Sequence, residues 1–235
     1  MLKNLSIILL AYNEQESIKK DIIYLNKYIK SKIKMCEIII VEDFSSDNTY
    51  KILKNISKKI SIKILRGSKR LGYRNSLVKG IKSSKYENIF FTESGRKYNF
   101  SEFANFSSDY NSRLIFSGYR SPRKDQLSRR FLTYSMNLFV RIMFGTKTYD
   151  LDSGYKLLSK KKFFHYYIKK QKYKDFGSCL MLIKMCLNKE KIIEKKISYN
   201  QRIDKSKQFN SFKIIKKSIY LAVQLIKLKI NYDNN

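Results

Sequence analysis

The chain has 235 residues, of which 43 % are apolar, and its formal net charge is +31. This length and apolar content argue against intrinsic disorder and allow one large domain with a buried core. Three widely spaced cysteines and a single histidine argue against a disulfide framework, a structural zinc site and Ser-His-Asp catalysis.

The positive charge suits an acidic partner, which could be nucleic acid, an anionic membrane surface or a phosphorylated substrate. The lysines are spread through every segment, so the charge equally fits a bias in composition. The sequence has no helix-turn-helix, zinc-finger or aromatic-basic RNA motif, and we therefore expect no nucleic-acid partner.

The first half of the chain alternates between apolar, β-branched runs and segments with helical spacing of apolar residues. Polar caps precede the helical segments. Such alternation predicts an α/β fold with a mostly parallel central sheet and helices on both faces. The predicted strands are 6–12, 36–43, 61–67 and 88–94, and the predicted helices are 14–30, 45–60 and 74–85.

The second half is less regular, and it contains no linker or repeat. We expect a single domain over residues 1–210, followed by a basic amphipathic helix and tail over 211–235. The expected elements are a strand at 114–120, an amphipathic helix at 129–145, an acid-rich loop at 148–160, a buried helix at 176–189, an edge strand at 191–202 and the tail helix at 212–230.

Polar residues follow three of the predicted strands. Asn13 and Glu14 come after the first strand, the consecutive acids Glu42 and Asp43 close the second, and Glu93 closes the fourth. In parallel sheets the binding crevice lies beyond the carboxyl ends of the strands, so we expect these side chains to share a site. Helix capping does not explain two acids that end a buried strand.

The motifs in these places resemble those of family 2 glycosyltransferases. They are "SIILLAYNEQESI" (6–18), "EIIIVEDFSSDNT" (37–49), "RLGYRNSLVKGI" (70–81) and "IFFTESG" (89–95). Later segments resemble the branch that glycosylates polyprenyl phosphate, of the dolichyl-phosphate mannose synthase type. These segments are 116–145, "DLDSGYKLL" (150–158) and "RIDKSKQF" (202–209). The resemblance implies the GT-A (Rossmann-like) fold and an inverting transfer from a nucleotide-diphosphate sugar.

The resemblance also implies roles for matching residues. Asp152 would be the catalytic base, with Asp150 and Glu93 as further catalytic acids, and Asp43 would hydrogen-bond the nucleotide base. Glu42, Phe44 and Asp204 depart from the family pattern, which usually has Asp, Gly and Gly there. The implied nucleotide-sugar site is Ala11, Tyr12, Asn13, Glu14, Glu42, Asp43, Gly72, Arg74, Ser94, Arg202 and Lys207, and the implied acceptor-phosphate site is Arg120, Arg130 and Ser135.

The family usually ends its fourth strand in Asp-x-Asp, which binds a divalent metal. Here Glu93-Ser94-Gly95 stands in its place, and Arg96 and Lys97 follow. Three outcomes are open: weak Mg²⁺ or Mn²⁺ binding through Glu93, replacement of the metal by Arg96 or Lys97, or an impaired enzyme.

We therefore expect a glycosyltransferase that uses polyprenyl phosphate. The tail helix places Phe212, Ile215, Ile219, Val223 and Ile226 on one face among lysines. It could lie in an anionic membrane surface, pack on the domain, or contact a membrane-anchoring partner protein. We expect a cytoplasmic protein, peripheral at the inner face of the membrane. The alternatives are a transferase that acts on a cell-surface glycan and a catalytically impaired module that binds nucleotide sugar.

Overall fold

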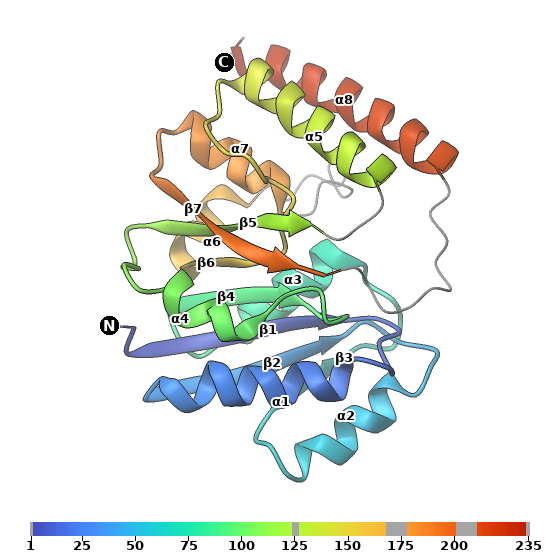
Figure 1. Cartoon of the computed structure of the whole chain (residues 1–235), viewed down its shortest axis with the longest axis vertical. Coiled ribbons are helices and arrows are strands. Elements are labelled where there is room, and N and C mark those ends of the chain that lie inside the picture. The colour runs from blue at the N-terminus through green and yellow to red at the C-terminus, as the bar shows by residue number, and fades with distance from the viewer. Residues whose placement is uncertain (1, 124–126, 168–177, 201–210, 234–235) are drawn as a thin grey trace.

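The structure, a computed structural model, describes residues 2–123, 127–167, 178–200 and 211–233. In this part of the chain one seven-stranded sheet runs through the molecule in the order β3-β2-β1-β4-β6-β5-β7 (Figure 1). The strands are β1 (Asn4–Ala11), β2 (Met35–Glu42), β3 (Lys63–Arg66), β4 (Asn88–Glu93), β5 (Ile115–Arg123), β6 (Lys156–Ser159) and β7 (Ile192–Tyr199).

The four N-terminal strands are parallel to one another, as the apolar runs predicted. Register pairs Ala11 with Glu42 and Leu10 with Glu93, so the polar strand ends meet at one edge of the sheet. β6 is antiparallel to both β4 and β5, and β7 is parallel to β5. The predicted fold class, α/β with a mostly parallel sheet, is confirmed.

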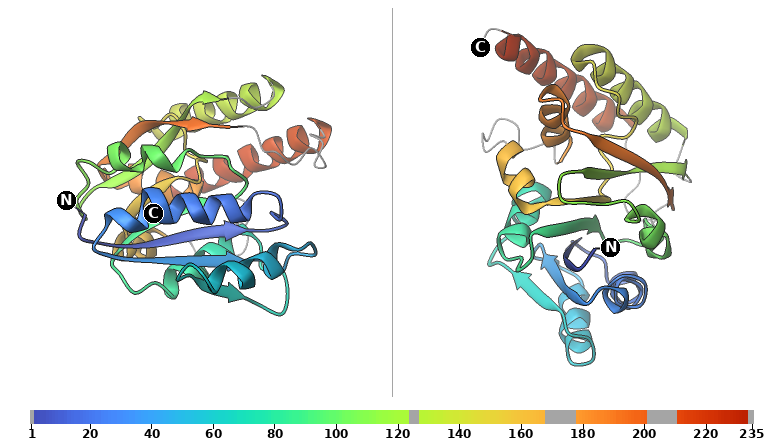
Figure 2. Two further views of the ribbon diagram at one scale, coloured as in Figure 1. Left: turned by 60° about the horizontal axis from the view of Figure 1, so that its bottom comes forward. Right: turned by 90° about the vertical axis from the view of Figure 1, so that its left-hand side faces the viewer.

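Helices cover both faces of the sheet (Figure 2). Alternate residues of β1 face opposite cores: Leu5, Ile7 and Leu9 pack in one, and Ile8 and Leu10 in the other. The helices are α1 (Ile18–Tyr28), α2 (Thr49–Ser57), α3 (Tyr73–Lys82), α4 (Phe103–Phe106), α5 (Leu127–Phe144), α6 (Lys160–Tyr166), α7 (Cys179–Leu187) and α8 (Ser211–Asp233), with short 3₁₀ turns η1 (Lys30–Lys32) and η2 (Phe100–Glu102).

The first core contains the apolar faces of α1, α2 and α4, and the second contains those of α3, α5, α6, α7 and α8. The predicted helices at 14–30, 45–60 and 74–85 therefore exist, although each is shorter than its apolar pattern. In each case the polar residues before the helix form a loop at the edge of the sheet.

One sequence prediction was wrong. The segment 148–160 was expected to be a loop throughout, but Lys156–Ser159 forms β6, which lies between β4 and β5. This strand is fully buried and only four residues long, too short for an alternating pattern to distinguish it from the loop before it.

The helices α5 and α8 pack against each other at one end of the molecule (Figures 1 and 2). Leu225 of α8 is buried in the second core, but Ile215, Ile219, Val223 and Ile226 are between 39 % and 60 % exposed. α8 therefore packs on the domain through a different face from the one that the sequence singled out. Within the described residues, no helix is both long enough and apolar enough to cross a membrane.

Candidate functional site

A cavity of about 210 Å³ opens at the carboxyl ends of β1, β2 and β4. It brings together six residues of the predicted site, which are Ala11, Tyr12, Glu14, Asp43, Glu93 and Ser94. The remaining lining residues are Leu10, Val41, Arg70, Tyr73, Ser76 and Lys97. The motifs therefore converge here because parallel strands end at the same edge of the sheet.

The loop before α3 is tied to Asp43. The backbone N–H groups of Leu71 and Gly72 donate to the two carboxylate oxygens at 2.7 and 2.9 Å. Gly72 has φ +79°, a conformation that favours glycine. The Arg70 guanidinium lies 3.8 Å from Asp43 and 3.8 Å from the ring centroid of Tyr12. The position of Arg70 within "RLGYR" was the only sequence signal for this lining residue.

Four described residues of the predicted nucleotide site are not among those that line the cavity: Gly72, whose bond to Asp43 is given above, and Glu42, Arg74 and Asn13. Glu42 is buried, lies 3.1 Å from Arg66 and accepts a hydrogen bond from the Ser45 N–H. Arg74 donates from Nε to the Tyr167 hydroxyl at 3.0 Å. Asn13, at φ 53°, accepts from the Ser46 N–H. These contacts hold the loops that surround the cavity.

The loop after β4 is held by Asp21 of α1. One carboxylate oxygen of this buried residue accepts from the Ser94 hydroxyl at 2.8 Å and from the Gly95 N–H at 2.9 Å, with a longer bond from the Arg96 N–H. Burial raises the pKa of Asp21, and these hydrogen bonds oppose the rise. No motif pointed to Asp21, because it lies on a helix 73 residues before Ser94.

Glu93 and Lys97 form an ion pair in the cavity. Lys97 Nζ lies 2.5 Å from Glu93 Oε2, and the side chains are 15 % and 25 % exposed. Burial pushes the pKa of Glu93 upward, but the charge and hydrogen bond of Lys97 outweigh it, and the pKa is lowered. Arg120 and Lys156 add to that lowering. Glu93 is therefore held as a carboxylate at neutral pH.

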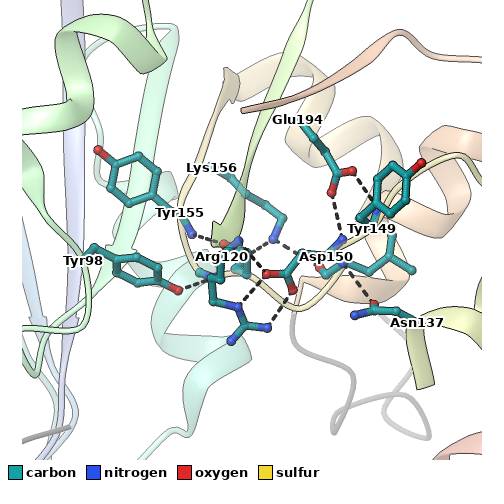
Figure 3. A network of polar contacts seen from close by, with 11 residues as sticks. Tyr98, Arg120, Asn137, Tyr149, Asp150, Tyr155, Lys156 and Glu194 are labelled. Atoms are coloured by element: carbon teal, nitrogen blue, oxygen red, sulfur yellow. Dashed lines mark hydrogen bonds and ion pairs between the residues drawn. The ribbon is translucent and has the colours of Figure 1, made fainter. Parts of the chain in front are cut away.

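Asp150 and Arg120 form a second, deeper ion pair (Figure 3). Arg120 donates from Nε and from its terminal nitrogen to the two Asp150 oxygens at 2.6 and 2.7 Å. Their side chains are 6 % and 3 % exposed. Asp150 was expected to be catalytic and Arg120 to bind acceptor phosphate, but each is engaged with the other.

Further bonds fix the segment around Asp150. Glu194 accepts from the N–H groups of Tyr149 and Asp150, and the Gly154 N–H donates to the Tyr98 hydroxyl at 2.9 Å (Figure 3). The Lys156 ammonium is fully buried and donates to the carbonyls of Leu151 and Ser153. The acid-rich loop thus has a defined shape.

Asp152 lies in this fixed segment and is exposed to solvent. Among the described residues, no hydrogen bond or ion pair engages its carboxylate. Desolvation by surrounding protein raises its pKa, the Glu93 charge adds to the rise, and Arg120 opposes it. Of Asp150 and Asp152, Asp152 is therefore the exposed one, and Asp150 is buried.

The remaining predicted residues either lie on α5 or fall outside the described residues. Arg130 and Ser135 are on α5, where Arg130 is exposed and Ser135 is half-buried. Arg202 and Lys207 lie outside the described residues.

Comparison with known proteins supports the same fold. Residues 6–94 match the profile described as glycosyl transferase family 2. No curated protein sequence matches the chain.

Several solved structures share the fold at low identity. Glucosyl-3-phosphoglycerate synthase from Mycobacterium tuberculosis, in complex with Mn²⁺, UDP and glucosyl-3-phosphoglycerate, has a TM-score of 0.70 at 12 % identity, over 97 % of this chain and 80 % of that one. Mannosyl-3-phosphoglycerate synthase from Rubrobacter xylanophilus has a TM-score of 0.69 at 8 % identity, over 97 % and 75 % of the two chains. A mannosyltransferase from Pyrobaculum calidifontis, with GDP-Man and Mn²⁺, has a TM-score of 0.62 at 13 % identity, over 88 % and 59 %.

Two of these structures hold Mn²⁺, but the present residues do not fit a divalent cation well. Such a cation prefers several hard oxygen ligands. Glu93 is paired with Lys97, and Gly95 offers no side chain. The described part of the chain contains no group of three or more His, Cys, Asp or Glu residues that could hold a metal ion.

The profile match and the structural matches are both to glycosyltransferases. The dolichyl-phosphate mannose synthase branch is not distinguished by either comparison. The chain has the fold of GT-A glycosyltransferases, and its residues 6–94 carry the sequence pattern of glycosyltransferase family 2.

Proposed function

We propose that this protein is an inverting glycosyltransferase that moves a sugar from a nucleotide-diphosphate donor to the phosphate of a polyprenyl lipid. The observation that carries the proposal is the cavity at the strand ends, where Tyr12, Glu14, Asp43 and Glu93 from three family motifs line one space. A Cβ at Gly154 would lie 2.5 Å from Glu93 Oε1, so the segment that carries Asp152 lies against the cavity, which supports a donor site and an acceptor site side by side.

In the proposed reaction an oxygen of the acceptor phosphate attacks the anomeric carbon of the donor sugar. The new carbon–oxygen bond forms as the bond from that carbon to the diphosphate oxygen breaks. The electron pair of the broken bond leaves with the nucleoside diphosphate, and the configuration inverts. Because a phosphate acceptor is already anionic at neutral pH, no general base has to remove a proton from it.

The acceptor is proposed from the surface beside the site. β5 runs parallel to β4 across β6, and α5 follows β5, so α5 begins near the edge of the sheet where the cavity opens. One stripe of α5 consists of exposed apolar residues at helical spacing. Its members and their exposed fractions are Leu127 (76 %), Phe131 (69 %), Tyr134 (64 %), Leu138 (38 %) and Ile142 (75 %).

A matching stripe lies on α8, the helix that packs against α5. Ile215, Ile219, Val223, Ile226 and Ile230 recur every three or four residues and are all exposed. Exposed cations accompany both stripes, among them Arg130, Lys216 and Lys227. Apolar rows with flanking cations suit the interface of an anionic membrane, where a polyprenyl chain is embedded. We accordingly propose a peripheral protein that acts at the inner face of the membrane.

The activity test incubates the full chain with UDP-glucose or GDP-mannose and one of three acceptors. These are undecaprenyl phosphate, 3-phosphoglycerate and an oligosaccharide with free hydroxyl groups. We expect labelled sugar to appear in the organic phase only with the polyprenyl acceptor. Transfer only to an oligosaccharide would support the glycan-acceptor alternative, and nucleotide-sugar binding without transfer to any acceptor would support an impaired binding module.

Asp152→Asn distinguishes phosphate from hydroxyl acceptors. General-base catalysis contributes about 10²–10⁴-fold to a rate, so the variant should lose that much activity toward a hydroxyl acceptor. With a phosphate acceptor, kcat should fall by less than about tenfold, because no proton is removed. A loss of about 10³-fold with polyprenyl phosphate would contradict the proposed chemistry.

Vesicle flotation tests the membrane proposal. We expect the chain to float with vesicles that contain phosphatidylglycerol and to remain below with pure phosphatidylcholine. Ile142→Asp and Ile219→Asp, at positions 75 % and 60 % exposed, should lose the binding without loss of fold. Ile23→Asp on α1, at 40 % exposed, is the matched control and should float like the wild type. Equal flotation of all three variants would contradict the assignment of this face.

A further inference from the structure

The loop after β4 carries a cation, Lys97, next to the position where the resemblance to family 2 glycosyltransferases implies Asp-x-Asp. Lys97 Nζ contacts the carboxylate of Glu93, and both side chains line the donor cavity. Glu14 lines the same cavity. The ammonium therefore lies in a cavity that also contains two carboxylates, and one of them is its ion-pair partner.

Gly95 makes room for this arrangement. A Cβ at this position would lie 3.2 Å from Glu14 Oε2 and 3.4 Å from Lys97 Cε. An aspartate there would crowd the lysine stem and add a carboxylate beside Glu14. Gly95 also has φ +105°, a conformation that strains other residues. The absence of the second family carboxylate and the presence of Lys97 are thus parts of one geometry.

The loop directs Lys97 and Arg96 to different places. Asp21 binds the hydroxyl of Ser94 and the backbone N–H groups of Gly95 and Arg96. With the loop held in this way, Lys97 lines the donor cavity, whereas Arg96 lines a separate cavity together with Asp21 and Tyr24. Of the two cations that the sequence offered as substitutes for a metal, only Lys97 reaches the donor site.

We propose that the Lys97 ammonium, held by Glu93, takes the place of the divalent cation and lets the site bind a nucleoside diphosphate without metal. This inference rests on the proposed function, because it concerns the donor of that reaction. When the bond from sugar to diphosphate breaks, its electron pair adds negative charge to the terminal phosphate. A cation fixed at that place stabilises the charge without having to be recruited from solution.

Calorimetric titration with UDP and with GDP tests the inference, because it needs no turnover. The full chain is titrated in EDTA and again in Mn²⁺. We expect one of the two nucleotides to bind with the same affinity, within about threefold, in both conditions. Lys97→Met should weaken that binding in EDTA by about tenfold or more, since a hydrogen bond to a charged group is lost.

The same variant leaves Glu93 free to ligate a cation, so Mn²⁺ should restore part of its nucleotide affinity. Lys59→Met is the matched control, because Lys59 is an exposed lysine just after α2, at the amino-terminal edge of the sheet. It should bind nucleotide like the wild type.

The outcomes separate this inference from the proposed function. Wild-type binding that vanishes in EDTA and returns with Mn²⁺ would overturn the inference and leave the glycosyltransferase proposal standing. The absence of UDP and GDP binding in both conditions would overturn the proposed function itself. The wild-type comparison decides the question even if Lys97→Met fails to fold, which circular dichroism would reveal.

Discussion

Replacement of Asp150 by alanine should destabilise the fold strongly, because it leaves the buried Arg120 guanidinium without its partner. Two side-chain bonds of 2.6 and 2.7 Å and one bond from the Arg120 N–H end on this carboxylate. The two side chains are 6 % and 3 % exposed, so water cannot readily replace the lost acceptor. Removal of one partner from a buried ion pair costs about 3–5 kcal/mol of unfolding free energy.

Urea unfolding followed by circular dichroism measures this loss, since the chain has no tryptophan to report by fluorescence. In a thermal scan the same loss corresponds to a decrease in Tm of roughly 6–20 °C for a protein of this size. Asp109→Ala is the matched control. Asp109 pairs with Lys195 at 2.9 Å, but its side chain is 77 % exposed, so this variant should unfold at the same urea concentration as the wild type.

A double variant tests the physical cause. Arg120→Met with Asp150→Ala removes both charges and should be more stable than Asp150→Ala alone, because no unpaired guanidinium remains buried. If the unfolding free energy of Asp150→Ala lies within about 1 kcal/mol of the wild-type value, the ion pair is not enclosed as the structure shows. Asp150 would then again be a candidate for direct catalysis.

Two further predictions concern packing and pH. In Gly118→Ala the new Cβ would lie 2.2 Å from Ile197 Cδ1. We expect the unfolding free energy measured in urea to fall by about 1–3 kcal/mol, and Ile197→Val should restore part of it. Gly67→Ala is the control and should be neutral, because no atom would lie nearer than 3.5 Å to its Cβ. An equal effect of the two alanine variants would contradict this packing. Burial lowers the pKa of Lys156 to about 8, from 10.5 for a free lysine. Between these values the unfolded chain binds a proton that the folded chain does not, so the unfolding free energy should rise with pH from about 8 to 10.5 relative to that of Lys156→Met. A difference between wild type and variant that stays constant with pH would show that Lys156 is not buried as a titrating group.

The local sequence determined which segments become the N-terminal strands and where their polar ends meet. Apolar β-branched runs predict buried strands, and parallel strands joined by helices must end at one edge of the sheet. For this reason Ala11, Tyr12, Glu14, Asp43, Glu93 and Ser94 could all be placed at one site from the sequence. Their spacing along the chain matters little, because the sheet brings the strand ends together.

Only the tertiary structure decided what each polar side chain contacts. Adjacent residues in a strand point to opposite sides, so Asp43 reaches the cavity while Glu42 is buried against Arg66. In the loop after β4, Lys97 enters the cavity and Arg96 does not, because Asp21 from α1 fixes the backbone at Gly95 and Arg96.

The same holds for the contacts of the second half. β6 exists because β4 and β5 offer hydrogen-bond partners on both sides, and Asp150 is enclosed because Arg120 lies on the strand beside it. α8 uses Leu225 to pack on the domain and leaves the row of isoleucines exposed. The spacing of apolar residues predicts that a helix has an apolar face. It does not predict which element packs on that face, because this depends on the tertiary packing of segments that are distant in the sequence.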